Sequence, residues 1–127
     1  MTIKDVAEKF DLSQDTLRYY EKVGLIPKVN RNSSGIRDYT EQDLRHVEFV
    51  KCMRQAGLSI EVLAQYISLY QDGDKTASDR RQILVDEREK LQERMVEMQE
   101  TLDRLDFKIN NYDRVLRGET KIKREDI

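Results

Sequence analysis

Several residue types and patterns that define common protein classes are scarce in this 127-residue chain. One cysteine excludes an intrachain disulfide framework, and one histidine leaves no Cys/His motif for a metal site. No apolar run approaches the ~20 residues of a membrane-spanning helix, and no basic segment followed by an apolar one opens the chain as a secretory leader would. We therefore expect a cytoplasmic protein with no membrane partner, no metal and no other cofactor.

Signals of catalysis are missing as well. His46 has no obvious nucleophile partner, no glycine-rich loop for phosphate is present, and the carboxylates follow the spacing of helix surfaces. The sequence therefore predicts no catalytic residues and no enzyme activity.

Charged residues, in contrast, are abundant and make up 38% of the chain, which is common in long exposed helices. The net charge is −2. Residues 1–55 carry ten Lys/Arg and nine Asp/Glu, or +1, and residues 56–127 carry thirteen and sixteen, or −3. This asymmetry is weak, so any interaction with nucleic acid has to be argued from individual side chains.

One short stretch, residues 17–26, carries the clearest functional signal. It places Arg18, Tyr19 and Lys22 within about two helical turns, and Gly24 ends it. Arginine reads guanine edges or holds phosphate, and tyrosine hydroxyls bind phosphate oxygens. We interpret this stretch as a recognition helix for double-stranded DNA.

The residues before this stretch predict its structural context. Thr2 begins a short helix that ends near Lys9, residues 11–12 form a tight turn, and Ser13 is a good cap for the recognition helix. A helix, a short turn and a capped helix at this spacing form a helix-turn-helix.

A turn-rich segment, residues 28–39, comes next. Val29 and Ile36 flank its tip, which favours a small hairpin, and Arg31 and Arg37 lie on the two arms. A basic hairpin after a helix-turn-helix is a wing. A mobile surface loop is the other interpretation of this composition.

Two more helices complete the predicted N-terminal domain. Thr40 caps a third helix that Gly57 closes, and Ser59 caps a fourth that residues 71–74 break. We therefore expect a mainly α fold, in which a winged helix-turn-helix DNA-binding domain spans residues 1–72.

Residues 73–118 are expected to form one long dimerisation helix. Its apolar residues alternate steps of four and three, the repeat of a coiled-coil seam: Leu91, Met95, Met98, Leu102, Leu105, Ile109, Tyr112 and Leu116. The chain has no second heptad segment, so the seam predicts a homodimer, with docking onto the chain's own N-terminal domain as the alternative. Residues 119–127 are expected to be a flexible tail.

The order of these parts, together with three motifs, resembles the MerR family of bacterial transcription regulators. The motifs are LRYYEKVGLI at residues 17–26, RDYTEQDL at 37–44 and GLSI at 57–60. The resemblance implies a homodimer with antiparallel dimerisation helices that binds a palindromic operator between promoter elements. It also implies an activator that bends and untwists this operator so that RNA polymerase can use the promoter.

Carried over by position, the resemblance implies seven DNA contacts. In this scheme Thr16, Arg18 and Tyr19 lie in the major groove, Arg31 and Arg37 hold phosphates from the wing, and Arg54 and Ser59 form a second wing. Each of these arginines could instead be a solvated surface charge.

Cys52 is the candidate sensor. It borders the polar face of the third helix, and the neighbouring Lys51 and Arg54 would favour its nucleophilic thiolate. A short chain with one cysteine here resembles the MerR subgroup that responds to aldehydes, electrophiles and nitrosative stress.

Two alternatives stay open at this point. In the first, the chain is a MerR-type regulator in which Cys52 is buried and structural, and the effector is non-covalent or absent. In the second, the chain is a coiled-coil interaction protein that does not bind DNA.

Overall fold

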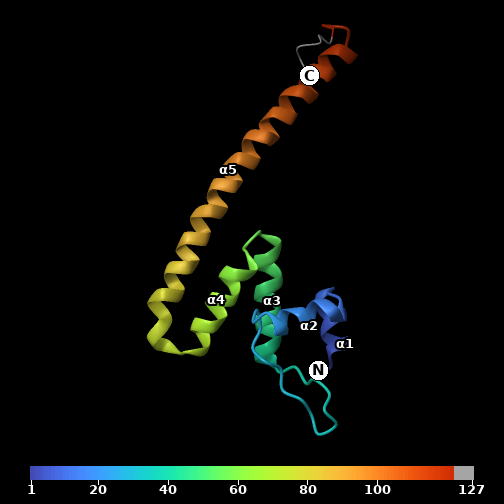
Figure 1. The fold of residues 1–127 in the computed structure, drawn as a ribbon. Coiled ribbons are helices and arrows are strands. Elements are labelled where there is room, and N and C mark those ends of the chain that lie inside the picture. The colour runs from blue at the N-terminus through green and yellow to red at the C-terminus, as the bar shows by residue number, and fades with distance from the viewer. Residues whose placement is uncertain (122–127) are drawn as a thin grey trace. The chain divides into compact units, whose positions relative to one another are not determined.

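The computed structural model describes residues 1–121, whose regular structure is helical (Figure 1). The elements in chain order are α1 Ile3–Phe10, α2 Gln14–Lys22, α3 Glu41–Gln55, α4 Ile60–Gln71, the 3-10 helix η1 Asp74–Thr76, and α5 Ala77–Leu116. The chain forms two compact units, Met1–Glu87 and a second that begins at Arg88. The predicted mainly α fold is confirmed. Within the described part, no helix is long and apolar enough to cross a membrane.

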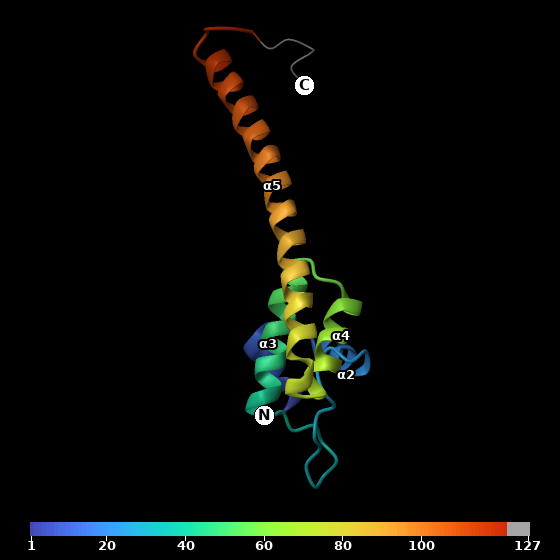
Figure 2. The same ribbon diagram turned by 90° about the vertical axis from the view of Figure 1, so that its left-hand side faces the viewer.

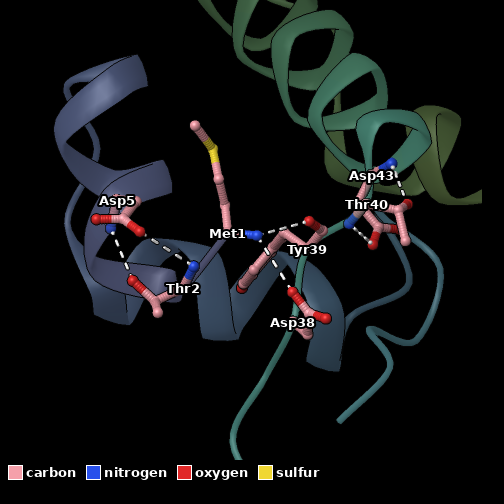
Figure 3. Close-up of polar contacts among 7 residues, drawn as sticks. All are labelled: Met1, Thr2, Asp5, Asp38, Tyr39, Thr40 and Asp43. Carbon is pink, nitrogen blue, oxygen red and sulfur yellow. Dashed lines mark hydrogen bonds and ion pairs between the residues drawn. The ribbon is translucent and has the colours of Figure 1, made fainter. Parts of the chain in front are cut away.

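Local capping explains where the first two helices begin. The Thr2 hydroxyl accepts from Asp5 N at 3.2 Å, and the Asp5 carboxylate accepts in return from Thr2 N at 3.3 Å (Figure 3). Asp11 closes α1 in the left-handed region with φ 53°, and Ser13 Oγ then accepts from Thr16 N at 3.0 Å to start α2. The predicted helix-turn-helix is therefore present with the caps expected for it.

The segment 28–39 forms a hairpin with a single antiparallel bridge, between Arg31 and Arg37. Asn32 holds its tip, because its side-chain oxygen accepts from Ser34 N at 2.9 Å and from Ile36 N at 3.1 Å. Val29 is buried in the core, whereas Ile36 is exposed. The wing is thus a turn held mainly by one asparagine, without a strand ladder.

Hydrogen bonds connect the end of this hairpin to the start of the chain. The ammonium group of Met1 donates to Asp38 Oδ1 at 3.2 Å and to Tyr39 O at 3.0 Å, and Tyr39 N donates to Met1 O at 2.8 Å (Figure 3). Thr40 then caps α3 by a reciprocal pair of bonds with Asp43. The residue pair Asp38 and Tyr39 therefore joins the wing, α1 and α3.

One apolar core holds the first unit together. Its fully buried members come from α1, α2, the segment after α2, α3 and α4: Val6, Leu17, Leu25, Ile26, Val29, Val47, Val50 and Leu63. Gly24, with φ 80°, makes the turn that sends Leu25 and Ile26 inward.

The first unit extends past the boundary expected at residue 72. The first turns of α5 run beside α4 in two views (Figure 1, Figure 2), and a groove between them is lined by Leu69 and Ile83. The DNA-binding domain expected over residues 1–72 stays a prediction. The dimerisation role of residues 73–118 stays a prediction.

Helix α5 has 40 residues, a length of about 60 Å at 1.5 Å per residue. Seven of its eight seam residues, all but Leu91, are half or more exposed, from 50% for Leu102 to 83% for Leu116. The helix ends two residues before Gly118, which has φ 79°, close to the predicted end. Most of the expected flexible tail, residues 122–127, lies outside the described residues.

His46 is buried on α3, and its Nε2 lies 3.4 Å from Gln42 Nε2. The Tyr70 ring meets it edge-on at 5.2 Å between centroids. Burial lowers the pKa of His46 below its usual range, and the nearby Asp43 carboxylate offsets part of this effect.

This pKa shift predicts a loss of stability in acid. The unfolded chain takes up the proton more readily than the folded chain, so the contribution of His46 declines as pH falls through 6.5 toward the lower folded-state pKa. We expect the difference in free energy of unfolding between wild type and His46→Gln to be larger at pH 7.5 than at pH 5.5, as measured by urea titration. An equal difference at both pH values would show that this ionisation is not linked to folding.

Candidate nucleic-acid interface

Burial of one face of α2 determines which of its side chains reach solvent. Leu17 and Tyr20 are buried in the core, so Arg18 and Tyr19 between them are exposed, and Thr16 is half-buried. The Thr16 hydroxyl lies 2.7 Å from Ser13 Oγ at the start of the helix. The structure therefore brings the three predicted groove residues together on one short helix.

Arg18 forms side-chain hydrogen bonds with two residues of its own helix, Asp15 and Gln14. Its Nη1 lies 2.9 Å from Asp15 Oδ1, and its Nη2 donates to Gln14 at 3.4 Å. The Arg18 side chain is 46% exposed and that of Asp15 is 95% exposed. Exposed ion pairs contribute about 0–1 kcal/mol, so a phosphate or a guanine can displace Asp15 at little expense.

Arg37 has a different environment from the one the sequence indicated. Its Nε donates to Glu21 Oε1 of α2 at 2.9 Å, and the two side chains are only 22% and 15% exposed. The pair ties the exit of the wing to the recognition helix across sixteen residues of sequence. Sequence reasoning missed Glu21, because no local spacing signals a contact between a helix and a later hairpin.

Arg31 shapes the tip of the wing. Its Nη1 donates to Gly35 O at 2.7 Å, so the guanidinium folds across the turn. Gly35 has φ 77°, a conformation that favours glycine. Arg31 remains exposed and available to a phosphate.

Arg54 and Ser59 lie at the two ends of the connection between α3 and α4. Arg54 Nη1 donates to Leu58 O at 2.7 Å, and Ser59 Oγ accepts from Val62 N at 3.1 Å. Burial raises the pKa of Tyr20, and the nearby Arg54 charge opposes this shift. The guanidinium and the positive end of α4 are both exposed, as an anion site requires.

Cys52 is exposed on α3, which argues against the buried structural cysteine that was one alternative. The neighbouring Lys51 is tied up elsewhere, because its Nζ donates to Phe10 O at the end of α1. Lys51 is therefore directed toward α1 and is not the free cation beside Cys52 that its place in the sequence suggested. Within the described residues, no group of three or more His, Cys, Asp or Glu side chains could hold a metal.

Known protein families match most of the chain. The family described as "MerR HTH family regulatory protein" matches residues 1–69, and the one described as "MerR, DNA binding" matches residues 44–106.

Two proteins of Bacillus subtilis (strain 168) are similar in sequence. The HTH-type transcriptional regulator AdhR is 57% identical over 91 residues, which cover 72% of this chain and 65% of AdhR. The aligned part thus spans less than two thirds of that relative. The uncharacterized HTH-type transcriptional regulator YyaN is 33% identical over 137 residues, with 96% of this chain and 97% of YyaN covered.

Solved structures share the fold. A Listeria monocytogenes protein assigned to the MerR family is 48% identical, with a TM-score of 0.89 over 93% of this chain and 89% of that one. HiNmlR, a MerR family regulator lacking the sensor domain, was crystallised bound to promoter DNA. It is 29% identical, with a TM-score of 0.81 over 89% of this chain and 90% of its own.

The two ion pairs predict different consequences for two matched alanine variants. Arg37→Ala leaves Glu21 partly buried without its cation, so we expect a loss of about 1–3 kcal/mol in free energy of unfolding. Arg18→Ala removes an exposed pair and should change it by less than ~0.5 kcal/mol. Urea titration of both variants measures this contrast.

Affinity for duplex DNA should show the opposite contrast. Arg18→Ala, which hardly changes stability, should weaken DNA binding strongly. We expect Arg18→Ala to lower affinity at least about tenfold while the fold stays intact, because a good base or phosphate contact contributes about 1–3 kcal/mol. Wild-type affinity in Arg18→Ala would remove this residue from the interface.

Proposed function

Because the chain belongs to the MerR family of transcription regulators, we propose that it binds a palindromic promoter operator as a homodimer and activates transcription by remodelling that operator for RNA polymerase. That it is a DNA-binding transcriptional regulator follows from the family and from its likeness to the DNA-bound HiNmlR. The partner copy, the polymerase, the cytoplasmic location and the activating mode belong to the proposal.

The observation that carries the proposal is the outward face of α2. Arg18 and Tyr19 stand exposed on a nine-residue helix whose other face is buried in the core. A major groove about 12 Å wide accepts one such helix. In this proposal the phosphate contacts on either side come from Arg31, Arg37, Arg54 and Ser59. Arg37 acts both by direct contact and through its ion pair with Glu21, which positions α2.

A second copy of the chain is the partner that the seam of α5 requires. Each seam side chain would contribute about 1.5–3 kcal/mol of gross stabilisation if it were fully buried. A long helix that leaves Met98, Leu105 and Ile109 in water lacks this contribution. An antiparallel pair of α5 helices would bury the seam and place two recognition helices on one duplex.

Disruption of the seam tests the dimer, and α5 offers a matched control. Phe107 is 68% exposed but lies off the four-three repeat, whereas Leu105 lies on it and is 52% exposed. We expect Leu105→Glu to produce monomers in sedimentation velocity and to weaken operator binding more than about tenfold, because a buried charge at the seam is unpaired. Phe107→Glu should remain dimeric. The reverse pattern would place the interface on another face of α5.

We further propose that the protein responds to aldehyde, electrophile or nitrosative stress through Cys52. The exposed thiol supports this, since a reagent can reach it. With an aldehyde, the sulfur adds to the carbonyl carbon and the thiol proton ends on the new hydroxyl, so the step is reversible and needs no oxidant. The adduct would bias the bound dimer between two shapes of the operator.

In vitro transcription from a cognate promoter tests the sensor. With formaldehyde as the probe, we expect the wild type to be induced and Cys52→Ser to stay at its basal level, while both bind the operator equally. Equal induction of both proteins would show that Cys52 is not the sensor, and an effector could then bind elsewhere as a non-covalent ligand. A surface hollow of about 440 Å³ between the turn at Gly24–Pro27 and α4 is large enough to be considered for such a ligand.

A further inference from the structure

The joint between α4 and α5 is built from side chains of the first unit. Gly73, with φ 85°, makes the bend, and η1 leads directly into Ala77. Thr76 is buried, and its hydroxyl lies 2.6 Å from Leu69 O and 2.8 Å from Gly73 O. This hydroxyl therefore holds the last turn of α4 and the bend together.

Arg80, one turn into α5, binds three parts of the joint at once. Its Nε donates to Thr76 Oγ1 at 3.1 Å, and its Nη2 donates to Gly73 O at 3.2 Å. Its guanidinium carbon lies 5.3 Å from the centre of the Tyr70 ring on α4. The planar, forked guanidinium is suited to such a set of contacts, whereas an ammonium is not.

Tyr70 extends this set of contacts to α3. Its hydroxyl accepts from Gln42 Nε2 at 3.0 Å, and its ring packs edge-on against His46. The resulting network runs from α3 through α4 to the first turns of α5, so it links the helix that follows the wing to the helix that carries the seam. We name Gln42, His46, Tyr70, Thr76 and Arg80 the joint network.

We propose that Arg80 is a positioning residue that fixes the direction in which α5 leaves α4, and that the protein thereby selects operators by the separation of their half-sites. This inference rests on the proposed function, because it requires a homodimer on a two-fold operator. Arg80 acts through the joint and does not itself contact DNA in this proposal.

The geometry of DNA explains why a stiff joint gives such selectivity. Each added base pair moves one half-site by about 3.4 Å along the duplex and rotates it by about 34–36°. A dimer with rigid joints can follow this change only by deforming the duplex, which weakens binding. A dimer with loose joints reorients its recognition helices and binds both spacings.

The test uses full-length protein and a duplex selected by the wild type from a random library, remade with one base pair added or removed between its half-sites. We expect wild-type affinity to fall about tenfold on either change. In Arg80→Met, which keeps an apolar stem of similar length, the fall should be less than about threefold, while affinity for a single half-site is unchanged. Arg81→Met is the matched control, since Arg81 is the next residue and stands outside the joint network, and it should behave as wild type.

Arg80→Lys keeps the cation near Tyr70 but loses the fork, so it should also lose part of the discrimination without unfolding. If Arg80→Met or Arg80→Lys discriminates between spacings as the wild type does, the inference is overturned. The proposed dimer is not affected by that result. Wild type that ignores spacing also overturns the inference and leaves the proposed dimer intact, because it would then bind as a dimer with loose joints does. Loss of discrimination in Arg81→Met as well would also overturn the specific role of Arg80.

Discussion

Burial of one face of α2 is the constraint on which the DNA-binding unit depends. A nine-residue helix is too short to be stable alone in water, so its position comes from its neighbours. Leu17 and Tyr20 enter a core shared with α1, α3 and α4, and Glu21 reaches the Arg37 guanidinium at the end of the wing. These two connections set the rotation of α2 and hence the direction of Arg18 and Tyr19.

The second constraint concerns α5. Its apolar seam is exposed to solvent, whereas the apolar face of α2 is buried in a core. Its seam residues are exposed over more than three heptads, and the charged side chains around them keep the helix hydrated. A helix of this kind gains most of its stability from association. In the proposed homodimer, folding of the second unit and dimerisation are therefore coupled, whereas the first unit has a core of its own.

Features encoded by neighbouring residues were predictable from the sequence. Thr2, Ser13, Thr40 and Ser59 all cap the helices expected of them, and the four-three repeat located α5. Contacts between distant segments were not predictable, because composition contains no distances. The pairing of Arg37 with Glu21 and that of Lys51 with Phe10 O belong to this class.

Four arginines of the first unit differ in role. One stabilises the fold through a largely buried ion pair, and the other three have guanidinium groups that DNA can reach. Arg37 is largely buried with its carboxylate, and removing one partner of such a pair leaves a poorly solvated charge. The ion pair of Arg18 with Asp15 is exposed to water and contributes little free energy. Breaking this pair so that Arg18 can contact DNA therefore costs little. Arg54 and Arg31 bind backbone carbonyls through one nitrogen each. A guanidinium has five N–H donors, so both can orient a loop and still bind phosphate. In the proposed interface, arginine thus both stabilises the fold and contacts DNA, and burial decides between the two roles.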